Sequence, residues 1–307
     1  MKVAITGATG FVGSSLVEKL HSQGHKILVL TRNANKAQQV FRASAFPNVE
    51  IVAYTPTESG KWQNAISGCD VVVNLAGEPI AEQRWTTTQK QKILNSRQLG
   101  TQKIVEAIGK ADEKPQVLVN ASAIGYYGTS ETATFTETSS PGNDFLAQVC
   151  QAWEGEAQKV TELGVRLVII RLGIVLGDEG GALAKMIPPF QIFAGGPLGS
   201  GNQWFSWIHR DDVVNLIIES IQRPDIEGTI NGTAPNPVRM SQLCQVLGQV
   251  MNRPSWLPVP SFALEMLLGD GAKVVLEGQQ VLPQKTESLG FKYQYPQIKS
   301  ALEEIIN

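Results

Sequence analysis

Short apolar, β-branched runs alternate with longer stretches of helical pattern along the first two thirds of the chain. The apolar runs are nearly continuous and fall at residues 3–6, 26–31, 49–53, 71–75, 116–121 and 166–171. Runs of this kind indicate strands that are buried on both faces, as in a parallel sheet. Helical patterns lie between them, most clearly at residues 87–110 and 144–163. The alternation predicts an α/β fold, a Rossmann-like doubly wound parallel sheet with right-handed crossovers.

The pattern changes after Gly177, where prolines and paired glycines interrupt the alternation of strand and helix. We expect a helix at residues 211–222 and a further strand at residues 229–232, followed by short helices and prolines. The chain therefore divides into a cofactor-binding domain at 1–235, which includes part of a substrate lobe, and a small C-terminal module at 236–307. Ligands of such sheets bind outside the carboxyl ends of the strands, where a late lobe would cover them.

Composition narrows the possible partners. The 307 residues include 42% hydrophobic residues and carry a net charge of -2, which gives no electrostatic footprint for nucleic acid or an anionic membrane. The three cysteines are scattered and lack the spacing of a metal site or a disulfide framework. The chain opens directly on a strand and has no long apolar run. We expect a cytoplasmic protein with a small-molecule substrate and no metal.

Three glycines in the first turn carry the strongest chemical signal. Gly7, Gly10 and Gly13 follow the first apolar run and precede an amphipathic stretch, so they predict a strand, a tight turn and a helix. The N-terminus of such a helix binds phosphate through backbone N–H groups. We therefore expect a dinucleotide at this turn, held by Gly7, Thr9, Gly10, Phe11 and Val12. The alternative is a glycine-rich turn in an unrelated α/β protein.

The ends of the second and fourth strands refine the choice of cofactor. NAD sites usually place an acidic residue after the second strand, whereas this chain has Thr31 and Arg32 there. A guanidinium pairs with a 2′-phosphate, which a carboxylate would repel. The prediction is NADP(H), the alternative being that Arg32 is a solvated loop charge. Leu75, Ala76 and Gly77 end the fourth strand with small residues past which the cofactor backbone can run.

Taken together, these segments resemble the extended short-chain dehydrogenases/reductases, the NAD-dependent epimerase/dehydratase family. The resemblance covers residues 1–235 and rests on Gly7 to Gly13, Asn74 to Gly77, Gly100-Thr101, Arg171 to Gly177 and Trp207 to Val213. It implies that Arg171 and Ile174 lie beside the nicotinamide end of the cofactor. Arg171 would suit a ribose or a substrate phosphate.

A narrower resemblance spans almost the whole chain. Its residues are Asn74 to Ile80, Arg84-Trp85, Ser96-Arg97, Ala123 to Gly128, Cys150, Trp153-Glu154 and the tail from Arg253. The sequence is similar to an atypical subgroup labelled both nucleotide-sugar epimerase and cell-division-inhibitor-like protein. Its tail resembles a C-terminal module of unknown function.

The family's acid/base pair is missing. Its members carry Tyr-x-x-x-Lys on one helix, in which the tyrosine transfers a proton and the lysine supplies positive charge. Here Cys150 and Glu154 occupy those positions, and a glutamate cannot supply that charge. Ser122 and Tyr126 are the remaining catalytic candidates. Tyr126 is equally open to a packing role, and Tyr127 is expected to be structural.

Five further residues are candidate substrate contacts. The subgroup resemblance implies Glu78 and Arg84 after the fourth strand, and Arg97 where the wider family often has asparagine. Cys150 would line the site if its helix faces the nicotinamide, although a free cysteine is more often a small core residue. His209 precedes a helix, where a structural hydrogen-bonding role is the stronger alternative.

Two functions from different classes remain open. The first is an NADP(H)-binding oxidoreductase or epimerase acting on a small carbonyl or alcohol, a nucleotide sugar being one candidate, with a non-standard acid/base set. The second is a catalytically impaired NADPH-binding sensor or regulatory protein linked to cell division, since the phosphate loop is kept while the Tyr/Lys pair is lost. The helical stretches 87–110 and 144–163 could form a homodimer.

Overall fold

The computed structural model describes residues 1–178 and 180–306. Seven parallel strands form the central sheet in the order β11-β7-β5-β4-β1-β2-β3. Their bounds are β1 Lys2–Thr6, β2 Lys26–Thr31, β3 Val49–Ala53, β4 Val71–Asn74, β5 Val117–Ala123, β7 Arg166–Leu172 and β11 Gly228–Gly232. The predicted doubly wound parallel sheet is confirmed. β5 runs two residues further than expected, which places Ser122 inside the strand rather than beyond it.

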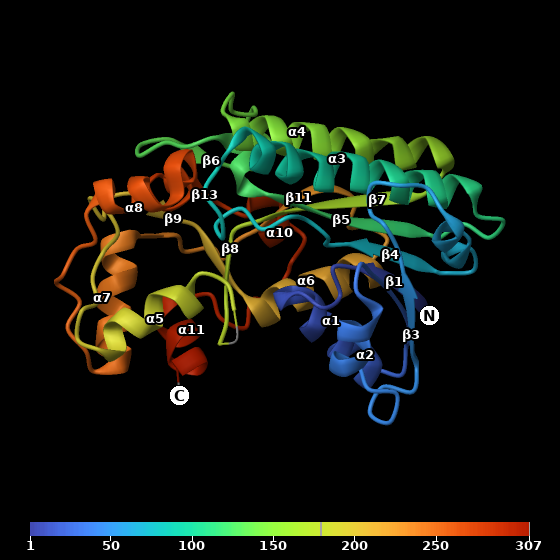
Figure 1. Cartoon of the computed structure of the whole chain (residues 1–307), viewed down its shortest axis with the longest axis horizontal. Helices are drawn as coiled ribbons and strands as arrows, with labels where there is room; N and C mark the ends of the chain where they lie inside the picture. Colours follow the sequence, from blue (N-terminus) through green and yellow to red (C-terminus); the bar gives the residue numbers. More distant parts are fainter. Residues whose placement is uncertain (179, 307) are drawn as a thin grey trace.

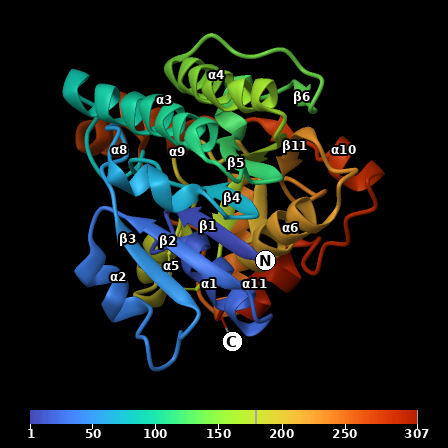
Figure 2. The same cartoon turned by 90° about the vertical axis from the view of Figure 1, so that its right-hand side faces the viewer.

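Helices cover both faces of the sheet (Figures 1 and 2). One layer consists of α3 (Thr87–Lys110) and α4 (Phe145–Gln158), and the other of α1 (Phe11–Ser22), α2 (Ala34–Val40) and α6 (Arg210–Gln222). The predicted helix at 144–163 is shorter than expected. α4 ends at Gln158 and the 3-10 helix η3 (Lys159–Leu163) takes up the rest, before the left-handed Gly164 ends it.

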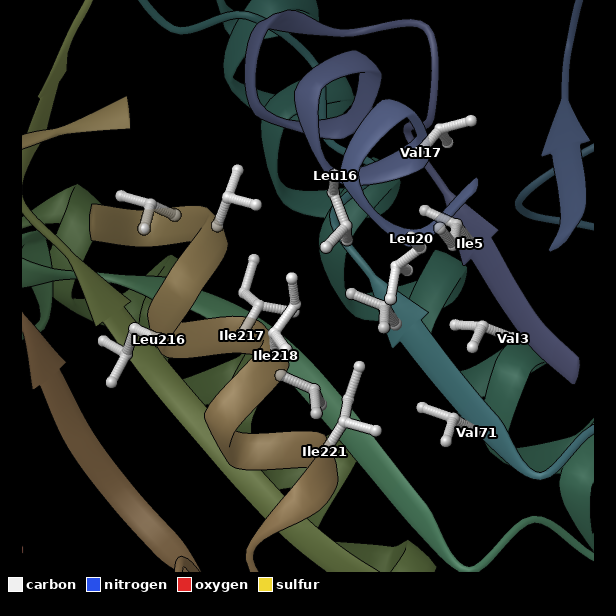
Figure 3. Packing of buried hydrophobic residues seen from close by; sticks show 14 of the residues in the cluster. Val3, Ile5, Leu16, Val17, Leu20, Val71, Leu216, Ile217, Ile218 and Ile221 are labelled. Atoms are coloured by element: carbon white, nitrogen blue, oxygen red, sulfur yellow. The ribbon is translucent and has the colours of Figure 1, made fainter. Parts of the chain in front are cut away.

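Alternate strand residues feed two cores, because successive side chains of a strand point to opposite faces. Figure 3 shows Val3, Ile5 and Val71 of the sheet facing the apolar sides of α1 and α6. The residues between them, such as Ala4 and Val72, pack against α3 on the opposite face. Both faces are buried, which explains why the strands read as unbroken apolar runs.

The later segments build a lobe beyond the carboxyl ends of the strands (Figure 1). It contains α5 (Leu183–Gln191), α7 (Met240–Met251), α8 (Ser261–Leu268), α9 (Lys273–Leu276), α11 (Ile298–Ile306), the short strands β8 (Ile174–Leu176), β9 (Trp204–Phe205), β10 (Trp207–His209) and β12 (Val238–Arg239), and η4 (Gly269–Ala272). A third core around Phe190, Trp207 and Leu243 joins α5, α7, α11 and the short strands of this lobe. Residues from both sides of position 235 therefore share one core, and the predicted domain boundary stays a prediction.

Five smaller elements complete the fold of the described residues. The 3-10 helix η1 (Lys61–Ile66) precedes β4, and η2 (Ile124–Tyr127) follows β5 directly. β6 (Thr134–Phe135) pairs with β13 (Gln280–Val281), and α10 (Gln284–Ser288) lies against β11, so the tail of the chain returns to the main sheet. Over the described residues, the structure has no helix long and apolar enough to span a bilayer.

Candidate functional site

The glycine turn after β1 has the geometry of a phosphate cradle. Gly7 adopts φ +69°, and a Cβ there would lie 2.9 Å from the Leu75 carbonyl carbon. A Cβ on Gly13 would come within 2.2 Å of the Gly7 carbonyl oxygen, so the helix can pack this close only with glycine. Gly10 is the N-cap of α1, and among the described residues no side chain caps that end. The first-turn N–H groups are therefore open to an anion, which fits a pyrophosphate.

A buried polar network holds the loop after β4 against this cradle. Thr6 Oγ1 donates to Asn74 Oδ1 at 2.7 Å and accepts from the backbone N–H groups of Leu75 and Ala76 at 3.1 and 3.2 Å. Asn74 Nδ2 in turn donates to Thr101 and Asn120 at 2.9 and 2.7 Å. Sequence reasoning missed Thr6 and Asn120, although polar residues at the ends of otherwise apolar strands are a usable signal.

Arg32 and Glu78 are brought together across two strand ends. Arg32 follows β2 and its side chain is 70% exposed, while Glu78 follows β4 and is 20% exposed. Their charged atoms, Nη1 and Oε2, are 3.8 Å apart. An exposed pair of this kind contributes at most about 1 kcal/mol, so Arg32 can exchange Glu78 for a stronger anion at little cost.

Ser122, Glu154 and Arg171 form a buried charged cluster under the strand ends. Glu154 Oε1 accepts from Ser122 Oγ at 2.6 Å, and both Glu154 oxygens accept from the Arg171 guanidinium at 2.8 Å. Burial alone would lower the pKa of Arg171, but the hydrogen bonds and charge of Glu154 raise it above its ordinary value. The Glu154 carboxylate on α4 thus fixes the buried, positively charged Arg171 of β7.

Two tyrosines of η2 lie on this arginine. The Arg171 guanidinium carbon is 3.3 Å from the centroid of the Tyr126 ring. Tyr127 is 3% exposed, and its hydroxyl accepts from Arg171 at 3.0 Å and donates to Asn231 at 2.7 Å. Burial raises the pKa of Tyr127. The Tyr126 side chain is half-buried, and its hydroxyl makes no hydrogen bond within the described part of the chain.

Arg97 and Cys150 lie on the α3 and α4 side of the same strand ends. Arg97 donates to the backbone oxygen of Glu78 at 2.9 Å and stacks over Trp153 at 5.2 Å. A Cβ on Gly77 would lie 3.0 Å from its guanidinium carbon, so Arg97 also supports the loop after β4. Burial, then the charge of Glu154, raise the pKa of Cys150 to about 11. Cys150 is therefore held as a neutral thiol beneath the site.

The remaining candidates lie further out. His209 caps α6: its Nδ1 accepts from the Asp211 N–H at 3.2 Å, and its Nε2 lies 2.8 Å from Glu304 Oε2. Both ring nitrogens are occupied and the residue is 2% exposed, which corresponds to the structural interpretation. Arg84 is exposed and packs against Gly269 at the lobe.

Ile174 and Phe11 lie at opposite ends of the stretch formed by β8 and the segment after it. Ile174 begins β8 and pairs through its N–H with the Ser206 carbonyl at 2.9 Å. Phe11 lies under the segment after β8, where a Cβ on Gly177 would come within 2.7 Å of its ring. The Phe11 ring is thus covered by the segment that leads into the lobe.

Sequence comparison assigns the chain to a known family. The profile of the NAD dependent epimerase/dehydratase family matches residues 3–231, and a domain of unknown function, DUF1731, matches residues 259–305. The chain belongs to this epimerase/dehydratase family. The expected family and C-terminal module are therefore both confirmed.

Individual members of the epimerase/dehydratase family match this chain end to end. The chain is 54% identical to the chloroplastic "Epimerase family protein SDR39U1 homolog" of Arabidopsis thaliana over 100% of this chain and 87% of that protein. It is 40% identical to "Epimerase family protein YfhF" of Bacillus subtilis over 100% of this chain and 98% of that protein. A crystal structure of the human epimerase family protein SDR39U1 with NADPH superposes with a TM-score of 0.87 at 32% identity, covering 99% of both chains.

Proposed function

We propose that this protein is an NADP(H)-dependent oxidoreductase or epimerase that acts on a small carbonyl or alcohol. The observation that carries the proposal is the open phosphate cradle at Gly7–Gly13 with Arg32 beside it, at the end of the adjacent strand β2. A cation at this place pairs with a 2′-phosphate. The human relative that was crystallised with NADPH supports the same choice.

Tyr126 is the proton donor and acceptor in this proposal. When bound, NADP(H) supplies or accepts a hydride. Tyr126 has a hydroxyl with no protein partner in the described chain and a guanidinium against its ring, so Arg171 would stabilise negative charge that develops on the phenol during proton transfer. Arg171 would thereby fill, from strand β7, the electrostatic role that the family's lysine fills from a helix.

Ser122 and Glu154 position this pair. Since Ser122 donates its only proton to Glu154, it can offer a substrate only its lone pairs. Glu154 holds the Arg171 fork in a bidentate contact, which fixes the plane of the guanidinium beneath Tyr126. We assign proton transfer to Tyr126 and positioning to Glu154 and Ser122.

A cofactor-dependent sensor is the second candidate, and one observation favours it. Ser122 is 2% exposed and bound to Glu154, while the phosphate cradle is complete. Such a protein would bind NADPH and change its affinity for a partner without turnover, as expected of linked sites. The link to cell division that the subgroup label implies belongs to this candidate.

Cofactor titration tests the shared premise. Binding of NADPH and of NADH is measured calorimetrically for the wild type, Arg32→Ala and the control Arg42→Ala, an exposed arginine beyond α2. Removing a charge-assisted contact is expected to weaken NADPH binding about 10-fold to 100-fold in Arg32→Ala only, and to leave NADH binding unchanged. Equal affinity of the wild type for both cofactors would show that Arg32 is a surface charge.

A carbonyl screen then separates the two candidates. NADPH oxidation is followed spectroscopically with aldehydes and ketones, and epimerisation of nucleotide sugars is followed by NMR, because an epimerase leaves its cofactor unchanged overall. Stoichiometric oxidation with any carbonyl, or epimerisation of a nucleotide sugar, supports the enzyme. Absence of turnover, together with a cofactor-dependent interaction in a pull-down, supports the sensor.

A further inference from the structure

A cavity of about 490 Å³ lies in the lobe, outside the cluster around Arg171. Its walls come from the loop after β4, from α5 and the turn that follows it, and from the region of α8 and α9. The lining residues are Ala81, Glu82, Arg84, Lys185, Met186, Pro189, Phe190, Ala194, Gly196, Leu198, Val259, Leu264, Leu267, Leu268 and Val275. A volume of this size accommodates a small organic ligand.

The chemistry of the walls is apolar and that of the rim is charged. Among the described residues that line the cavity, all but Glu82, Arg84 and Lys185 lack a polar side chain. Those three are exposed, so they stand at the opening. A nucleotide sugar needs many hydrogen-bond partners for its diphosphate and hydroxyl groups, and this interior does not supply them.

The cavity connects to the cofactor site through one loop. That loop begins with Gly77 and Glu78 beside the cradle and reaches the cavity wall three residues later, at Ala81. Lys185 Nζ on α5 donates to the Ala81 carbonyl at 2.9 Å, which ties the lobe to the loop. The cavity therefore lies in the lobe beyond the carboxyl ends of the strands, the side on which ligands of such sheets bind.

We propose that the substrate is an apolar carbonyl or alcohol with a hydrocarbon chain, and that this cavity holds the chain. The proposal rests on the proposed function. In the reduction, the carbonyl carbon gains the hydride that NADPH loses, and the oxygen gains the Tyr126 proton, which solvent replaces. The products are the alcohol and NADP⁺, so the step balances without another reactant.

The surface around the opening fits the entry of an apolar molecule. Leu267 lines the cavity yet is 69% exposed, and Phe262 and Met266 on the same helix α8 are 66% and 73% exposed. An apolar path thus runs from solvent over α8 into the cavity. The exposure of these apolar side chains to solvent is explained if ligands pass across them.

The test uses straight-chain methyl ketones from hexanone to decanone, with UDP-glucose as the polar comparison. Dissociation constants are measured by saturation-transfer NMR on the full chain, with and without NADPH. Burial of each added methylene is expected to tighten ketone binding about fourfold. UDP-glucose is expected neither to bind comparably nor to displace decanone.

Variants locate the binding. Ala194→Phe fills the cavity and Leu264→Ser makes its wall polar without adding volume; each is expected to weaken decanone binding at least tenfold. Ala184→Phe, an exposed position on α5 that does not line the cavity, is the matched control and should bind like the wild type. Unchanged NADPH affinity shows that a variant is folded. If Ala194→Phe does not fold, decanone binding by Leu264→Ser decides whether the cavity is the binding site.

Three results would overturn the inference: affinity independent of chain length, displacement of decanone by UDP-glucose, or unchanged binding in Leu264→Ser. Because the ketones are also measured without NADPH, a failure here is distinct from failure of the cofactor proposal. Chain-length dependence that persists in both cavity variants would place binding on the exposed face of α8 instead and would equally refute the cavity.

Discussion

The Glu154–Arg171 pair makes a sharp energetic prediction. Glu154→Gln keeps the side-chain volume but removes the charge that compensates a guanidinium whose side chain is only 5% exposed. Removing one partner of a buried pair costs about 3–5 kcal/mol, because the other charge stays desolvated. Glutamine keeps part of the hydrogen bonding, so we expect a loss near the lower end, about 3 kcal/mol, and a fall in melting temperature of about 5 °C.

The assay is equilibrium urea unfolding followed by tryptophan fluorescence. Glu156→Gln is the matched control: it lies two residues further on the same helix, and its partner Lys159 is 53% exposed. An ion pair of this kind is worth at most about 1 kcal/mol, so the control should change the free energy of unfolding by less than that.

A double variant separates charge burial from lost packing. Glu154→Gln combined with Arg171→Met removes both charges, so that no buried ion is left without its counter-charge. The double variant should therefore be more stable than Glu154→Gln alone. Two results would refute the view that an uncompensated Arg171 charge dominates the stability of this site. One is an equal loss of unfolding free energy in Glu154→Gln and Glu156→Gln, and the other is a double variant less stable than Glu154→Gln.

Three further predictions concern the site. Tyr126→Phe should lower turnover with any accepted carbonyl about 100-fold or more while leaving NADPH affinity intact. Tyr127→Phe loses buried hydrogen bonds and should mainly lower the melting temperature, and the reverse pattern would exclude Tyr126 as the proton donor. Because the pKa of Cys150 is raised to about 11, its thiolate forms only as pH approaches that value, so alkylation of the native protein at pH about 8 should be far slower than in urea, as mass spectrometry of the modified peptide can show. Gly13→Ala should abolish NADPH binding or folding, while Gly155→Ala, which meets nothing within 4 Å on α4, should stabilise the protein by about 0.5–1 kcal/mol; similar melting curves for the two would contradict the close packing of the cradle.

The strands of the main sheet and the cofactor cradle could be predicted because their signals are local. An unbroken apolar run needs only its own residues to indicate a doubly buried strand, and Gly7 to Gly13 encode their turn within seven positions. The register between strands is not local. β5 pairs with β7 so that Ser122 lies opposite Arg171, and only this adjacency shows that Glu154 can reach both.

Arg171 shows why the candidate site was harder to predict than the fold. Its place at the end of a strand suggested a ligand for ribose or phosphate, but the residue is 4% exposed and its guanidinium is bound by Glu154 and Tyr127. A role as a direct phosphate ligand stays a prediction. The lobe cavity lay further out of reach, since its walls come from three separate stretches of chain, 81–84, 185–198 and 259–275.

The loop after β4 has a consequence for how cofactor and substrate affect each other's binding. Its first residues are held from the cofactor side, with Glu78 paired to Arg32, and its later residues form a wall of the cavity. When Arg32 pairs with a 2′-phosphate, the Glu78 carboxylate loses its contact with Arg32. The loop is therefore anchored differently with and without a bound 2′-phosphate. Any preference of a substrate for one state must appear, by the same factor, as a preference of the cofactor for the substrate-bound protein. The choice between NADPH and NADH would then be made partly at the far end of this loop, by whatever occupies the lobe.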